Sequence, residues 1–173
     1  MDILNLEKNF SPFRLLIELG SPVHVPNDPV HLDSLLEYVC LSHLCDYEKA
    51  KASLSHLLAQ KDGVFQASAM GFGITSSMGL VASDISKVKK MSSSVLSSSR
   101  VLPTGKNGRY KKIQLLGGPT KNHLNKLRCL YAPYVVFDGV GNGDVITRLF
   151  SFYLTNLGKD HGLGLGRIGR IEL

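Results

Sequence analysis

The amino-acid sequence predicts an α+β fold, on the strength of two periodic patterns and the order in which they follow one another. Four short runs of β-branched, aromatic or small residues are typical of strands. They span residues 13–19, 63–72, 131–137 and 168–173. Residues 31–41 and 145–157 instead repeat apolar side chains at helical spacing. With residues 74–130 set aside, the order strand, helix, strand, strand, helix, strand predicts a split βαβ, or ferredoxin-like, fold. Its four-stranded antiparallel sheet would carry two main helices on one face.

The first half of the chain supplies one strand, two helices and a second strand. Residues 13–19 alternate well enough for a strand that ends at Gly20-Ser21-Pro22. Residues 47–60 are predicted to form a second helix after the helix at 31–41. The apolar face expected to be buried on the first helix consists of Leu32, Leu35, Leu36, Val39 and Cys40.

The C-terminal stretch is predicted to run strand, helix, glycine-rich loop, strand. Three glycines at 139, 141 and 143 are expected to break the strand 131–137, and Asn142 or Asp144 can cap the helix that follows. Gly158 stands where the C-cap glycine of the helix 145–157 is expected.

Composition indicates a folded protein without a membrane span. Apolar residues make up 43% of the chain, and no apolar run reaches the roughly 18–20 residues that a bilayer requires. The first residues lack the pattern of a signal peptide. Cys40 and Cys129 lie in apolar patterns and are expected to be buried thiols. We therefore expect a cytoplasmic protein with no membrane partner.

The net charge of +6 comes from one central segment. Residues 1–84 hold ten acidic and five basic side chains, and residues 138–173 hold four of each. Residues 85–137 hold eleven basic and no acidic side chains, which predicts a polyanionic partner. The alternative is a solvated flexible loop that is basic by chance.

Within one domain, 1–173, the basic, Ser-rich insertion is placed at 74–130. Residues 100–116 resemble a hairpin that turns at Asn107-Gly108. Lysine outnumbers arginine, which suits contact with a phosphate backbone more than base reading. The candidate RNA contacts in the insertion are Lys106, Arg109, Lys111, Lys112, Lys121, Lys126 and Arg128.

The loop glycines 162, 164 and 166 allow main-chain N–H groups to approach a phosphate closely. The loop follows a helix and precedes a strand, which excludes the Rossmann and P-loop motifs. A tight structural turn is the alternative reading. The candidate phosphate contacts here are Lys159, His161, Gly162, Gly164, Gly166 and Arg167.

No histidine spacing predicts a metal site, and no cofactor motif is present. His31 and His161 are candidates for a general base in a metal-free ribonuclease, although neither has an acid partner evident in the sequence. The alternative interpretation of His31 is that it is a capping or surface residue at the start of a helix.

Several motifs of the chain, taken together, resemble those of the RAMP superfamily of CRISPR-associated proteins. The motifs are Phe137, Gly139, Gly141, Gly143 and Asp144, then Asn156 to Lys159, then Gly162, Gly164, Gly166, Arg167 and Ile168. Residues 30–36 and 65–69 also look like the type IV effector subunit that binds the 5′ handle of CRISPR RNA. The resemblance implies a ferredoxin-like (RRM-like) fold whose glycine loop faces RNA. It also implies partners, namely CRISPR RNA and the backbone and large subunits of a surveillance complex, with target DNA and a recruited helicase as further candidates.

Three functions are compatible with these observations. The first is a non-catalytic subunit that holds the 5′ handle of the guide RNA. The second is a metal-independent endoribonuclease that processes CRISPR RNA with His31 or His161 as general base. The third is a general nucleic-acid-binding module. The first is the leading hypothesis, and under it the protein is not an enzyme.

Overall fold

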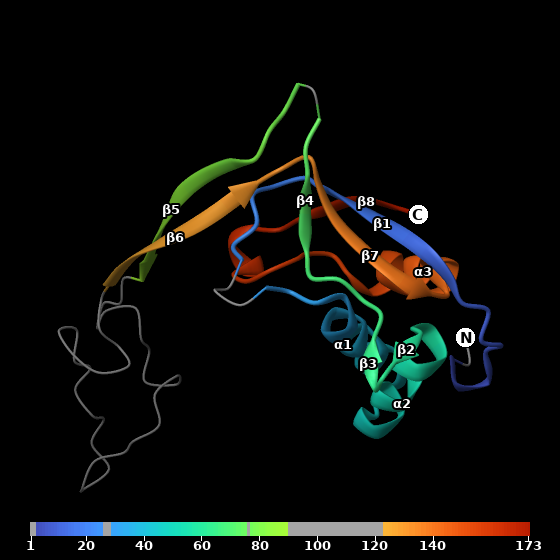
Figure 1. The fold of residues 1–173 in the computed structure, drawn as a ribbon. Coiled ribbons are helices and arrows are strands. Elements are labelled where there is room, and N and C mark those ends of the chain that lie inside the picture. The colour runs from blue at the N-terminus through green and yellow to red at the C-terminus, as the bar shows by residue number, and fades with distance from the viewer. Residues whose placement is uncertain (1–2, 26–28, 76, 90–122) are drawn as a thin grey trace, which may run out of the picture. The chain divides into compact units, whose positions relative to one another are not determined.

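The computed structural model describes residues 3–25, 29–75, 77–89 and 123–173. Within these residues the chain forms an α+β protein with three α-helices, a four-stranded antiparallel main sheet and two further strand pairs (Figure 1). The main sheet has the order β4 (Gly71–Gly73), β7 (Tyr134–Gly141), β1 (Ser11–Leu19), β8 (Ile168–Glu172). The helices are α1 (Leu32–Leu44), α2 (Tyr47–Leu57) and α3 (Gly143–Tyr153).

The core lies between one face of this sheet and the helices. Residues of β1 alternate, so that Phe13, Leu15, Ile17 and Leu19 are buried while Arg14 and Glu18 are exposed. This alternation follows from the two-residue period of a strand with one covered face. The predicted buried face of α1 is confirmed except at Leu35, which is half-buried.

Two of the predicted helices end earlier than expected. The helix predicted at 47–60 ends at Leu57, and the helix predicted to end at 157 ends at Tyr153. Gly158 is therefore not the C-cap of α3, which is Leu154 in an extended conformation. The physical reason is that the Leu157 N–H donates to the Gly166 carbonyl (2.7 Å), which keeps this segment beside the loop instead of in the helix.

The single strand predicted at 63–72 is wrong. Residues Gln60–Lys61 (β2) and Val64–Phe65 (β3) form a hairpin whose turn residues, Asp62 and Gly63, both have positive φ. Beyond it, Ser68 N–H donates to Asp138 of β7, while Met70 N–H donates to Val30 (2.8 Å each). The segment between β3 and β4 thus divides its hydrogen bonds between two neighbours, so it does not form one continuous ladder.

The glycines at 139 and 141 do not break β7, contrary to the prediction, since the strand continues to Gly141. They are required there by packing. A Cβ at Gly139 would press on the Phe13 ring, and one at Gly141 would collide with the Leu57 carbonyl oxygen. Asn142 then caps α3, accepting from Val145 N–H at 3.4 Å.

The chain divides into two compact units, Met1–Ser83 with Arg128–Leu173, and Asp84–Leu127. Strands β5 (Val81–Lys89) and β6 (His123–Tyr131) form a two-stranded sheet. Strand β6 falls where the sequence predicted only a basic stretch. The hairpin predicted at 100–116 lies outside the described residues. In the described part of the chain, no helix is long and apolar enough to cross a membrane.

Candidate nucleic-acid interface

The glycine-rich loop, residues 158–167, connects the segment after α3 to β8 and contains a short 3-10 helix at His161–Leu163. The residues that follow β1 hold it in place. Gly166 N–H donates to the Pro22 carbonyl (2.7 Å), and Arg167 N–H donates to Ser21 Oγ (2.8 Å). Ser21 Oγ–H in turn donates to the Gly164 carbonyl (2.8 Å). The fold therefore already uses the N–H groups of Gly166 and Arg167.

Two of the loop glycines are required by the backbone. Gly166 has a φ of +65° and is buried, and a Cβ there would collide with the Leu157 carbonyl oxygen. Gly158 has a φ of +80°, and its Cβ would collide with the His24 carbonyl oxygen. Glycine is the residue that meets both requirements, because it has no Cβ and tolerates positive φ.

Gly162 and Gly164 are exposed, and a Cβ at either would meet no atom within 4 Å. Gly164 has a φ of +76°, and its N–H donates to the His161 carbonyl (2.8 Å). Of the three predicted phosphate-cradle glycines, Gly162 is thus the most open to a ligand. Gly166, in contrast, is well explained by the alternative interpretation of the loop as a tight structural turn.

Three cationic or titratable side chains on the loop, Lys159, His161 and Arg167, are exposed. No ion pair joins Lys159 or Arg167 to another described residue. His161 Nε2 lies 2.7 Å from the Gly158 carbonyl oxygen, which can only accept, so Nε2 carries the proton. Lys159 and Arg167 thus carry exposed positive charges on either side of Gly162 and Gly164 in the sequence.

A His–Asp pair beside the loop was not predicted from the sequence. His24 Nδ1 lies 2.9 Å from Asp160 Oδ2, and their side chains are 21% and 18% exposed. Lys159 N–H also donates to the His24 carbonyl (2.9 Å). The pair fastens the start of the loop to the segment after β1. No local signal could have identified it, because the two residues are 136 positions apart.

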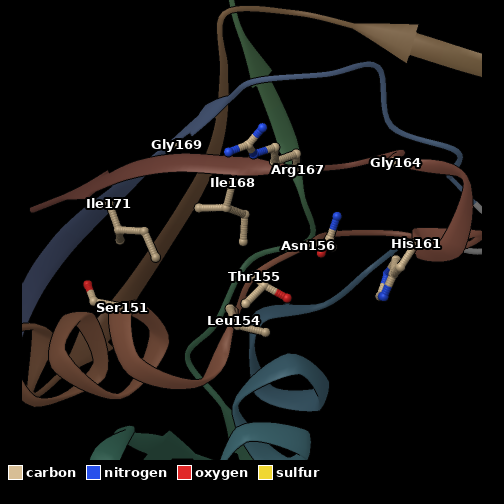
Figure 2. A pocket seen from close by; sticks show the side chains of 10 residues that line it. All are labelled: Ser151, Leu154, Thr155, Asn156, His161, Gly164, Arg167, Ile168, Gly169 and Ile171. Atoms are coloured by element: carbon tan, nitrogen blue, oxygen red, sulfur yellow. The ribbon is translucent and has the colours of Figure 1, made fainter.

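A pocket of about 510 Å³ lies beside the loop, between the end of α3 and β8. Figure 2 shows Ile168 and Ile171 pointing toward Thr155 and Ser151, while the Arg167 side chain lies on the other side of the strand from Ile168. The remaining lining residues are Leu154, Asn156, His161, Gly164 and Gly169. The pocket therefore combines an apolar floor with hydroxyl groups and one end of the glycine loop.

The two histidines proposed as alternative general bases lie on different elements. His31 is the N-cap residue of α1, is exposed, and makes no capping hydrogen bond through its side chain. Its backbone forms a bridge with Ala69, whereas His161 bonds to Gly158. No hydrogen bond joins these histidines, and no group of three potential metal ligands occurs, within the residues the structure describes.

The buried thiol of Cys40 is not an activated nucleophile. Cys40 is buried as predicted, and burial, with a further contribution from Glu37, raises the pKa of its thiol to about 12. A thiol with such a pKa stays protonated at neutral pH. Cys129 is also buried as predicted, and Cys45 is exposed at the end of α1.

On the uncovered face, the strands of the main sheet carry two arginines, Arg14 and Arg170, and three carboxylates, those of Glu18, Asp138 and Glu172. Arg14 Nε and Asp138 Oδ1 are 2.7 Å apart, and Arg170 Nε and Glu172 Oε1 are also 2.7 Å apart. The hydrogen bond from Arg14 lowers the pKa of Asp138. The stability this pair adds is therefore present above the ordinary carboxyl pKa and is lost as the pH falls through the lowered one. Since both arginines are paired, this face is a poor platform for phosphates.

Two of the predicted insertion contacts fall on described residues. Lys126 and Arg128 are exposed on β6, and the residues after them, Leu127 and Cys129, are buried. Residues two apart on a strand share a face, so both cations point the same way. Lys106, Arg109, Lys111, Lys112 and Lys121 lie outside the described residues.

No protein-family model matches this chain, and no curated protein matches it. The function is therefore inferred from the chemistry of the chain and the geometry of the loop.

Proposed function

We propose that this protein binds RNA without cleaving it, as the subunit of a type IV CRISPR RNA-guided complex that holds the 5′ handle of the guide RNA. The observation that carries the proposal is the acid-free segment 85–137 with its eleven basic side chains. Lys126 and Arg128, which belong to this segment, share one face of β6. Such a density of unopposed positive charge favours a polyanion, because binding releases counterions from the phosphates.

The described fold supports this proposal through its strand order. From β8 through β1 and β7 to β4, all neighbouring strands are antiparallel, and the helices cover one face. This order and these directions are compatible with a split βαβ fold, so the ferredoxin-like (RRM-like) topology is part of what we propose. RRM-like proteins often stack bases on sheet aromatics. Here Tyr134 is the one aromatic on the open face of the described main sheet, so we place the RNA at the loop and the insertion.

The non-catalytic form of the proposal fits the histidine geometry. A catalytic histidine needs an acceptor nitrogen and a group that orients the ring. In His161, Nε2 donates to Gly158, so Nδ1 is the nitrogen left to accept, and no carboxylate among the described residues hydrogen-bonds to His161 or to His31. The proposed partners are CRISPR RNA and the backbone and large subunits, with target DNA and a recruited helicase as further ones. A cytoplasmic location belongs to the same proposal.

The test is a binding titration with a repeat-derived RNA oligonucleotide at several salt concentrations. Lys106, Arg109, Lys111 and Lys112 are replaced together by Ala. This change should reduce the slope of log K, where K is the association constant for the RNA, against the logarithm of the salt concentration by roughly 3. Each neutralised phosphate of single-stranded RNA contributes roughly 0.7 to this slope. The matched control replaces four cations outside the segment, Lys8, Lys49, Lys51 and Lys61, and should leave the slope unchanged. An equal effect of both variants would contradict the proposal.

The same samples separate binding from catalysis. Repeat RNA incubated with the protein in EDTA should stay intact for hours. Cleavage that is abolished by His31→Ala or His161→Ala would instead establish the endoribonuclease alternative. Equal affinity for repeat RNA and for unrelated RNA or DNA would favour a general nucleic-acid-binding module.

A further inference from the structure

Strand β8 has an outer edge that is open from Gly169 onward. On its inner side β8 pairs with β1, where Gly20 N–H donates to the Arg167 carbonyl (2.8 Å). On the outer side Ile168 N–H donates to the Thr155 carbonyl (3.0 Å), and Asn156 bridges Arg167. Past this point no described residue pairs with the outer edge. An open edge presents unpaired N–H and C=O groups that another strand can bind.

The side chains along this open edge have a distinct order. Arg170 and Glu172 lie on the uncovered face of the sheet, 76% and 44% exposed, and bond to each other. Ile171 pairs with Ile17 on the covered face, where it contacts the core and lines the pocket beside α3. Along the edge, a positive residue (Arg170) is therefore followed by an apolar residue (Ile171) and then a negative residue (Glu172).

We propose that β8 is a self-association edge, at which a second copy of this chain pairs its own β8 antiparallel about Ile171. In this register Arg170 faces Glu172 of the second copy, and Glu172 faces the second copy's Arg170. The two Ile171 side chains meet on the covered face, over the pocket. Opposite charges directly across a strand pair stabilise it, and like charges destabilise it.

The neighbouring symmetric registers are unfavourable. Pairing centred on Arg170 would place the two Arg170 side chains opposite each other, and pairing centred on Glu172 would do the same with the two glutamates. A register centred on Ile171 is the one among these three that satisfies both charges. This self-complementarity is why we commit to a second copy rather than to a strand of another protein.

The pairing would leave both glycine loops accessible. Arg167 lies four residues from Ile171, so the two copies of Arg167 would be eight strand positions, or about 27 Å, apart at opposite ends of the pair. Because only residues 169–173 would pair, the interface is far smaller than that of a stable dimer, and the association should be weak and concentration-dependent.

Sedimentation velocity over a wide range of protein concentration, with the protein freed of nucleic acid, tests this edge. The unmodified chain should shift from monomer to dimer. Arg170→Glu or Glu172→Arg should each weaken the dimer roughly tenfold, since each creates two like-charged pairs. The double variant R170E/E172R restores opposite charges and should recover the dimer. The matched control is Arg148→Glu, an exposed arginine on α3, which should leave association unchanged.

A chain that stays monomeric at every concentration would overturn the proposal, as would a dimer that ignores the single reversals. If a reversal unfolds the protein, amide exchange in the unmodified chain decides the question. Protection of residues 169–173 should rise with protein concentration, and protection that does not change would count against the edge. None of these measurements uses RNA, so their outcome is independent of the proposed function.

Discussion

The two glycine runs of this chain share the same spacing and lie in different surroundings. At 139, 141 and 143 each added Cβ would meet a packed neighbour: Phe13, the Leu57 backbone, or Leu173 with Phe13. At 162 and 164 an added Cβ would meet nothing within 4 Å, and at 166 it would collide with Leu157. An added Cβ is therefore hindered at every glycine of the first run. The second run combines one packed glycine with two glycines that are open on the Cβ side.

The difference shows that a glycine pattern has no single meaning. Within β7, glycine allows the end of α2 to come close, and Asn142 N–H donates to the Leu57 carbonyl (2.9 Å) as a result. In the loop, Gly166 performs a similar packing role while Gly162 faces solvent. Substitutions by alanine separate these roles, because the same added methyl group meets backbone in one place and open space in the other.

The largest effect is expected for Gly166→Ala. The substitution forces a Cβ into positive φ and against the Leu157 carbonyl, which should cost roughly 2–5 kcal/mol of unfolding free energy. Denaturant unfolding followed by circular dichroism measures the loss. A variant as stable as the unmodified protein would show that Gly166 is not required by packing.

Gly141→Ala should come next. Its backbone has an ordinary φ, so the cost comes from the collision with the backbone of Leu57 and Leu58 and should be roughly 1–3 kcal/mol. The same unfolding measurement applies, with Gly79→Ala as the control because a Cβ there meets no atom. A loss no larger than that of the control would contradict the packing role of the first run.

The elements with strong periodicity could be predicted from the sequence, and the contacts between distant segments could not. Strand β1 and helix α1 follow from their apolar repeats, and β8 was placed correctly after the loop. The hairpin turn at Asp62-Gly63 carries a recognisable signal, although the strand predicted at 63–72 overlaps it. Turn glycines and packing glycines look alike in a sequence, which is why β7 was predicted to end too early.

For the candidate site, the residues of the loop could be identified from the sequence, and the contacts that hold the loop could not. The loop and its cations are local in sequence, so they could be named in advance. The anchoring contacts from Ser21 and His24 could not, because they depend on chain segments more than 130 residues away. Such contacts determine which loop glycines are left open to a ligand.

Cys45→Gly is expected to increase the unfolding free energy slightly, whereas the two glycine substitutions above decrease it. Cys45 has a φ of +53° at the end of α1, where its N–H donates to the Leu41 carbonyl (2.9 Å). Glycine relieves the left-handed strain but loses more entropy on folding, so the net gain should be about 0.5–1 kcal/mol. Asp160→Gly is the informative control. It also relieves a positive φ, but it removes the carboxylate that pairs with His24 and should give no gain.

The smallest effect on stability, and the most informative one for function, is expected for Gly162→Ala. Its φ is ordinary and its surroundings are open, so the unfolding free energy should change by less than about 0.5 kcal/mol. If RNA approaches the main chain there, the added methyl group should weaken binding several-fold without changing the salt slope, because the charge of the protein stays the same. Arg167→Ala should instead flatten the slope by roughly 0.7, as one phosphate is no longer neutralised. Unchanged RNA affinity in Gly162→Ala would mean that the open half of the loop makes no contact with RNA. The case for RNA would then depend on the basic segment alone, and the two glycine runs would differ only in how tightly their neighbours pack.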